Sequence, residues 1–247
     1  MAIKKVALGS RWLSATDVVD RLKQARENRE QQAKLLDSLE AQARQRRDDV
    51  ARSLADLPEG QRGQLVARAV NGYRNELKRG SADARRAHLK EAGRLLEQTD
   101  GARAHYQSPV QMLMREGLGS ERRSRLLQQI AHSGPVELAS LAEFAAATKD
   151  NELGAALCAR VSDLAPNERP FSSRDLADAL VGEEHRRVTA ALMELDRLTQ
   201  EAAHADSAFE RGAANPVRSI RIARMKQAEA AVGADLVNLD DTEDEEE

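Results

Sequence analysis

Glu201-Ala-Ala-His204 is the pair of side chains in this sequence that comes closest to a metal-binding motif. Glu and His three residues apart lie on one face of a helix, as they do in di-iron bundles, which also need a second such pair and two further glutamates. The sequence contains no second Glu-x-x-His, and Glu194 lies in the same segment rather than on a partner helix. We therefore expect a solvated helix face and no metal.

The single cysteine could act as a nucleophile if a histidine lay beside it. Cys158 could pair with His132 or His185, but it lies in the apolar run 155–159, where a cysteine usually fills a core. No glycine-rich phosphate loop, Gly-x-Ser-x-Gly elbow or Cys-x-x-Cys pair is present. These observations favour a protein that is not an enzyme, with no catalytic residue and no cofactor. One cysteine also excludes a disulfide within the chain.

Residues 171–198 have the pattern of a helix-turn-helix, with Gly182 at the turn. The second helix would begin at Glu183, and Arg186 and Arg187 would lie near DNA phosphates if it entered the major groove. The two glutamates that precede His185 would be repelled by the same phosphates. An ordinary helical hairpin and a DNA reader both fit the pattern, and the charges favour the hairpin.

These side chains must be positioned by helices, because the sequence is helix-forming almost throughout. Residues 16–57 contain no Gly, Pro or aromatic residue in 42 positions, and 18 of them are charged. A continuous helix of that length would extend for about 63 Å. Ser14 and Asp17 have the spacing of a capping box, which predicts the helix start near Thr16.

The long helix carries an interrupted apolar seam typical of coiled coils. The seam steps by four and three residues, with Arg29, Gln32, Arg46 and Ser53 as its polar members. It can pack against the rest of its own chain or form a coil with a second copy, and the interruptions favour the first. If it meets a partner, we expect contacts through Leu22, Leu36 and Leu39.

Gly and Pro divide the remainder of the chain into shorter helices. We predict an antiparallel return over 61–79 and further helices at 82–98, 109–116, 120–132, 137–148, 151–164, 172–181, 184–205 and 217–231. No stretch alternates as a strand does, so the expected fold is all-α without a sheet. The expected regions are an arm (1–15), an elongated coiled-coil-like region (16–107), a compact helical-hairpin domain (108–210), a basic amphipathic helix (211–239) and an acidic tail (240–247).

The charge is divided unevenly along the sequence. Seven of the last eight residues are acidic, and without them the formal charge changes from −3 to +4. The tail fits a solubilising segment, or one that competes with polyanions for basic groups or binds a basic partner. The helix before it presents Arg218, Arg221 and Arg224 as candidate partner contacts. Trp12, beside basic residues in the arm, is another candidate.

The sequence contains no apolar run of 18 residues, so we expect no membrane span and synthesis in the cytoplasm. With its long charged helix, few aromatics and acidic terminus, the whole chain resembles helical virion and head-assembly proteins of tailed bacteriophages. That resemblance implies a structural protein that forms a homo-oligomer or joins a larger assembly, with the virion as its destination. The alternative is a nucleic-acid-binding regulator that reads DNA with 171–198 and is restrained by its acidic tail; this alternative is not favoured.

Overall fold

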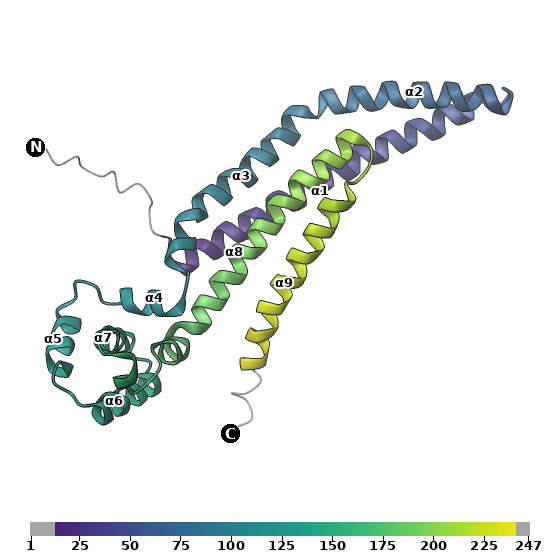
Figure 1. Cartoon of the computed structure of the whole chain (residues 1–247). Helices are drawn as coiled ribbons and strands as arrows, with labels where there is room; N and C mark the ends of the chain where they lie inside the picture. The colour runs from purple at the N-terminus through teal and green to yellow at the C-terminus, as the bar shows by residue number, and fades with distance from the viewer. Residues whose placement is uncertain (1–12, 241–247) are drawn as a thin grey trace, which may run out of the picture. The chain divides into compact units, whose positions relative to one another are not determined.

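A computed structural model describes the backbone of residues 13–240 and the side chains as far as residue 232. Within this part of the chain the protein has nine α-helices, one short 3-10 helix and no strand (Figure 1). The predicted all-α fold is confirmed. None of the described helices is long and apolar enough to cross a membrane. Trp12 and the acidic residues 241–247 lie outside the described part.

Five of the described α-helices have 22 residues or more, and four shorter α-helices follow the third of them in sequence. The helices are α1 (Ala15–Ser53), α2 (Glu59–Gly80), α3 (Ala82–His105), α4 (Pro109–Arg115), α5 (Glu121–Ile130), α6 (Pro135–Thr148), α7 (Asn151–Ser162), η1 (Pro166–Glu168), α8 (Ser173–Arg211) and α9 (Pro216–Asp240). They form two compact units. In the described part, the first unit contains 13–19, 99–193 and 229–240, and the second contains 20–98 and 194–228.

The start of α1 is fixed by its predicted capping box. The backbone N–H of Asp17 donates to Ser14 Oγ at 3.1 Å, and the backbone N–H of Ser14 donates to Asp17 Oδ2 at 3.1 Å. Each side chain thus satisfies a backbone donor that the first helical turn leaves without a partner. The helix begins at Ala15, one residue before the predicted start.

In the second unit, α2 and the first part of α3 return along α1 in the opposite direction, as predicted. Arg74 on α2 pairs with Glu40 on α1 at 2.6 Å, and Asn28 on α1 donates to the backbone oxygen of His88 on α3 at 3.0 Å. Between α2 and α3 the side chain of Ser81 is buried and donates to Leu77 O. This hydrogen bond satisfies a carbonyl at the end of α2.

The part of α8 in the second unit runs parallel to α1. Arg26 on α1 forms a two-bond ion pair with Glu194, and six residues further along α1 Gln32 donates to the backbone oxygen of Ala202 at 3.1 Å. A cluster of Leu36, Leu39 and Phe209 then fills the space between the two helices. The seam predicted on α1 is therefore covered by the chain itself as far as Ala43.

The first unit is built around α7, a short helix buried over most of its length. Seven of its twelve residues are buried, namely Leu153, Gly154, Ala155, Ala156, Leu157, Cys158 and Val161. Helices α4, α5 and α6 all pack against it. Alanine and glycine make this possible, because small side chains allow neighbouring helix backbones to come close.

The predicted turn at Gly182 is wrong, and so is the helix-turn-helix at 171–198. Helix α8 continues through this position from Ser173 to Arg211. Its buried residues keep helical spacing on both sides of the glycine, at Ala177, Val181 and Val188. A lone glycine costs a helix only about 1 kcal/mol relative to alanine, so the packing of this stripe outweighs it.

The two units combine segments that are far apart in the sequence. The predicted regions 16–107, 108–210 and 211–239 are each continuous in sequence, unlike the two units. Their boundaries therefore stay predictions.

Candidate interaction surfaces

The end of α1 and the whole of α2 form a helical hairpin without a core. We call residues 44–80 the hairpin tip. None of its side chains is buried, although α2 alone has 22 residues. Arg46 on α1 lies over the ring of Tyr73 on α2, with its guanidinium carbon 5.9 Å from the ring centre. The two helices thus contact each other while one side of the hairpin lacks a covering layer.

The uncovered part of the hairpin tip contains apolar side chains between charges of both signs. Leu65 is 46% exposed, and Val66 and Val70 are half-buried. The two valines and Ala51 line a hollow of about 480 Å³ whose other lining residues are Arg47, Glu59, Arg62, Gly63, Ala67 and Asn71. An apolar floor with a mixed-charge rim is the arrangement found at protein interfaces.

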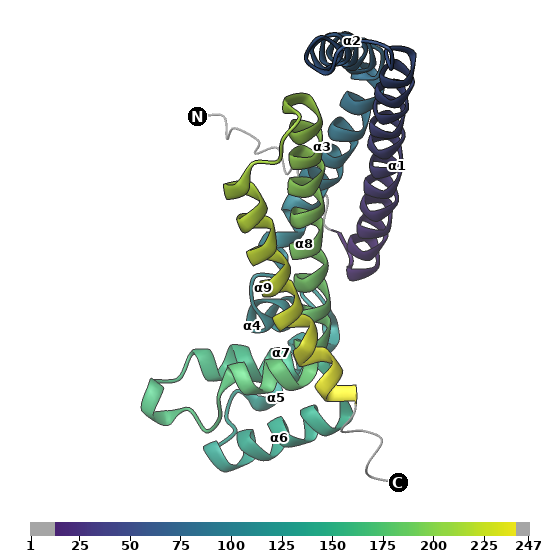
Figure 2. The same cartoon turned by 90° about the vertical axis from the view of Figure 1, so that its right-hand side faces the viewer.

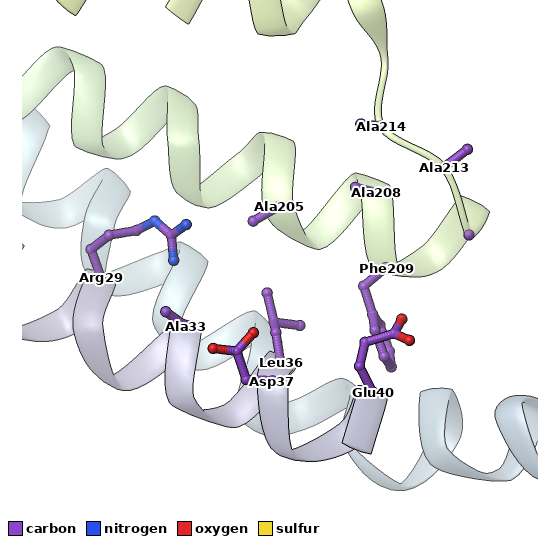
Figure 3. A pocket seen from close by; sticks show the side chains of 11 residues that line it. Arg29, Ala33, Leu36, Asp37, Glu40, Ala205, Ala208, Phe209, Ala213 and Ala214 are labelled. Atoms are coloured by element: carbon purple, nitrogen blue, oxygen red, sulfur yellow. The ribbon is translucent and has the colours of Figure 1, made fainter. Parts of the chain in front are cut away.

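A second hollow, the α1–α8 groove, lies between the two parallel helices of the second unit (Figure 3). It has a volume of about 360 Å³ and is lined by Arg29, Ala33, Leu36, Asp37, Glu40, Ala205, Ala208, Phe209 and residues 212–214. The alanines make it shallow and open. In Figure 3, Phe209 points from α8 toward α1 and lies beside Glu40.

Arg29 supplies the polar end of the α1–α8 groove. Its Nε and Nη1 atoms are buried without a hydrogen-bond acceptor, and the nearest carboxylate oxygen, on Glu201, lies 4.0 Å from Nε. A guanidinium in this state can donate hydrogen bonds to a carboxylate or carbonyl oxygen of a bound segment. Asp37 and Glu40 lie along the same wall of the groove.

Phe209, at the other end of the groove, is held in place by a buried cation. The guanidinium carbon of Arg85 lies 5.0 Å from the centre of the Phe209 ring. Arg85 also pairs with Asp206 at 2.6 Å and with Glu210, and its side chain is 5% exposed. A buried cation needs such partners, and these two carboxylates fix α3 against α8.

The first part of α9 presents a basic stripe. Arg218, Arg221 and Arg224 are spaced by three residues, which places successive side chains side by side on a helix, and all three are exposed. Lys226 is exposed as well, and Val217 and Ile220 are 76% and 57% exposed. Within the described chain none of these four cations forms an ion pair, whereas Arg26, Arg74 and Arg122 pair between helices.

Within the second unit, the first part of α9 runs back along α8 (Figure 2). Ser219 Oγ lies 2.9 Å from His204 Nε2, and among the described side chains of α9 only Ile222, Met225, Glu229 and Val232 are half-buried. None of the side chains described on α9, which extend to residue 232, is buried. Its cations are therefore open to a further partner.

The residues predicted to contact partners are distributed differently from expectation. Leu22, Leu36 and Leu39 are buried inside this chain, because α1 packs against α3 and α8, and so they offer no free surface. Arg218, Arg221 and Arg224 are exposed. Sequence reasoning did not identify the hairpin tip or the α1–α8 groove. For the groove, the signal was the small residues Ala33, Ala205 and Ala208.

The side chains considered for metal binding, nucleophilic catalysis and DNA contact are paired with other residues or buried. Glu201 pairs with Arg197 at 2.7 Å, and the described residues contain no cluster suited to a metal ion. Burial raises the pKa of the Cys158 thiol to about 11, despite a hydrogen bond to Ser173 O, so it is protonated near neutral pH. Arg187 pairs with Glu183, and Arg186 is half-buried. These two side chains are therefore not arranged to contact DNA phosphates as predicted.

A buried tyrosine in the first unit has a strongly raised pKa, as the Cys158 thiol does. Burial raises the pKa of Tyr106 to about 12, and the carboxylates of Glu184, Asp17 and Glu116 act in the same direction. Burial also raises the pKa of Glu116 and lowers that of His185. Each shift favours the neutral form, as expected where polar groups are buried for packing.

The sequence matches no family model, and neither the curated proteins nor the solved structures include a match to it.

Proposed function

We propose that this protein is a non-enzymatic helical assembly protein that acts through protein–protein contacts. The single observation that carries the proposal is the hairpin tip, where residues 44–80 expose an apolar face and bury no side chain. Most helical stability in proteins comes from covering such a face rather than from helix propensity. A partner that covers Leu65, Val66 and Val70 supplies what the chain itself lacks.

The rim of the tip indicates the kind of partner. Arg47 and Arg62 lie on it together with Glu59, so a partner needs an apolar face flanked by both signs of charge. Charges arranged in this way set the register of an interface more than its affinity. A helix or helical hairpin meets this requirement, including the same tip on a second copy.

The test compares two exposed leucines. Leu65→Glu places a charge in the apolar face of the tip, and Leu118→Glu makes the same change in a loop of the first unit, where Leu118 is 67% exposed. We expect Leu65→Glu to weaken self-association or particle incorporation at least tenfold in sedimentation equilibrium or co-sedimentation. Leu118→Glu should leave both unchanged. Equal behaviour of the two variants would contradict a role for the tip.

Within this class, we propose a virion or head-assembly component of a tailed bacteriophage. The long charged helix, the scarcity of aromatic residues and the acidic terminus support this assignment. Mass spectrometry of purified particles from cells that make the protein tests it. We expect the chain at a fixed copy number per particle. Its absence from particles and from their assembly intermediates would contradict the assignment.

A nucleic-acid-binding regulator is the second candidate, favoured by the unpaired cations on α9. Because α8 is continuous, this candidate relies on the basic stripe rather than on a helix-turn-helix. Binding through phosphates would weaken steeply as salt rises, without sequence preference. Electrophoretic shifts of duplex DNA at 50 mM salt, with and without Arg218→Glu, test it. No shift at micromolar protein would exclude it.

A further inference from the structure

We propose that the basic stripe of α9 binds the acidic C-terminal segment, residues 240–247, of a second copy of this chain. The inference rests on the proposed function, since it names one partner within an assembly. It starts from the arginines of the stripe, which form no ion pair within the described chain, and from the sequence of the C-terminal segment, in which seven of the last eight residues are acidic.

The charges of the second unit make the stripe attractive to an anion. That unit contains 24 Lys and Arg residues against 18 Asp and Glu, whereas the other unit, with the terminal segments, contains 14 against 23. Within the described side chains of α9, Glu229 is the single acidic residue and lies outside the stripe. An acidic segment therefore meets little repulsion along the stripe.

The geometry of α9 itself excludes an efficient match within one chain. Arg224 precedes Asp240 by 16 residues and Arg218 precedes it by 22, which correspond to about 24 Å and 33 Å of helix. The seven residues after Asp240 extend for at most about 25 Å. A reversed, fully extended tail would bring only its last carboxylates level with Arg224 and none level with Arg218. The tail of a second copy has no such restriction.

The observations favour this acidic segment over a nucleic acid. Every copy of the chain carries one tail for each stripe, so the two are present in equal amounts. Val217 and Ile220 lie exposed beside the arginines. A peptide can exclude water from such apolar side chains, whereas a phosphate backbone leaves them in contact with solvent.

The association should be weak for a single contact and sensitive to salt. Exposed ion pairs are individually weak and screened at high ionic strength. Several pairs along one stripe act together, and repetition of the contact through an assembly multiplies their effect. We expect the contribution to be clear at 50 mM salt and lost at 500 mM.

The direct experiment uses a fluorescein-labelled peptide with the sequence of residues 240–247 and the full chain truncated after Asp240. We expect salt-dependent binding in fluorescence anisotropy. The triple substitution Arg218→Glu, Arg221→Glu and Arg224→Glu in the truncated chain should weaken it at least tenfold. The matched control reverses Arg86, Lys90 and Arg94, three exposed cations on α3, with the same change in net charge. Equal weakening by both triple variants would overturn the proposal.

A second experiment tests the contact between full-length copies. We expect truncation after Asp240, or the α9 triple substitution, to raise the dissociation constant of self-association at least tenfold at 50 mM salt. An equimolar mixture of the two variants should regain association, because one supplies the stripe and the other the tail. The circular dichroism of each variant should match the parent, since the stripe arginines have no partner in the described fold.

The outcomes also separate this proposal from the proposed function. Loss of association in Leu65→Glu at both salt concentrations, with no effect of truncation, would overturn the tail contact and leave the tip as the interface. Tighter binding of duplex DNA after truncation, without any change in self-association, would show that the tail covers α9 of its own chain. That result would overturn the contact in trans and favour the nucleic-acid regulator.

Discussion

Helices α7 and α2 each contain seven apolar residues but have opposite surroundings. Seven of the twelve residues of α7 are buried, whereas none of the 22 residues of α2 is. Helices α4, α5 and α6 pack against α7, while α2 meets the end of α1 and leaves Leu65 exposed. An apolar helix face is therefore stabilised when another element packs on it, but the face alone does not show whether that element belongs to the same chain or to a partner.

Among these tests, replacing a leucine by alanine should give the largest difference in stability between α7 and α2. Leu157 on α7 is fully buried, and Leu157→Ala should lower the free energy of unfolding by about 3 kcal/mol through lost contacts and a residual cavity. The matched change Leu65→Ala on α2 should cost less than about 1 kcal/mol. Urea unfolding followed by circular dichroism measures both. Equal costs would mean that α2 is covered in solution.

The two tyrosines extend the comparison to pH. Tyr106 is buried in the first unit with a pKa raised from 10.0 to about 12, and Tyr73 on α2 is half-buried. Because the folded state favours the neutral phenol, this stabilisation is fully present below pH 10 and is lost as pH rises through 12. It amounts to about 2 kcal/mol.

Absorbance at 295 nm during alkaline titration of Tyr73→Phe isolates the ionisation of Tyr106. We expect a midpoint near pH 12, accompanied by loss of helical signal. An ordinary midpoint near 10 with the fold intact would show that Tyr106 is more exposed than described.

Glycine-to-alanine changes should have opposite signs in the two helices. A Cβ at Gly154 on α7 would lie 2.2 Å from Leu180 Cδ1, so Gly154→Ala forces that side chain to move and should cost about 1 kcal/mol net. At Gly72 on α2 nothing lies within 4 Å of an added Cβ. Gly72→Ala should therefore stabilise by about 0.5–1 kcal/mol through helix propensity. Thermal unfolding of both variants checks the signs.

The smallest effect concerns the ion pair that joins α2 to α1. Arg74 and Glu40 lie 2.6 Å apart and are each about one-third exposed. Arg74→Ala should cost about 0.5 kcal/mol, less at high salt. Hydrogen exchange of α2 amides at 50 and 500 mM salt measures the change. A cost well above 1 kcal/mol would mean that this pair, rather than a missing partner, governs the hairpin tip.

The sequence was sufficient for the elements that depend on local signals. The Ser14–Asp17 box located the start of α1, and Ser-Pro and Gly-Pro located the starts of α4 and α6 within two residues. The seam of α1 was read correctly as an apolar stripe. Packing of this seam against its own chain was favoured, but its extent could not be inferred, because burial up to Ala43 and exposure beyond it depend on where α8 ends.

The candidate surfaces depended on information that a local pattern lacks. Gly182 resembles a turn in sequence, yet buried side chains on both sides hold α8 straight through it. The sequence predicted an antiparallel return over 61–79, and nothing local reveals that Leu65 on it stays exposed. The basic stripe of α9 was visible from its arginine spacing, and the structure adds their exposure and the absence of ion pairs within the described chain.

Gln32 has a consequence for the alignment of α1 and α8. Its side chain is fully buried among alanines and leucines, and its amide nitrogen donates to one backbone oxygen, that of Ala202. A rotation of α8 that carried this carbonyl away from Gln32 would leave a dry N–H without an acceptor, which costs more than a small loss of apolar contact. Gln32 thus favours the rotational setting of α8 against α1 that brings the Ala202 carbonyl to its amide.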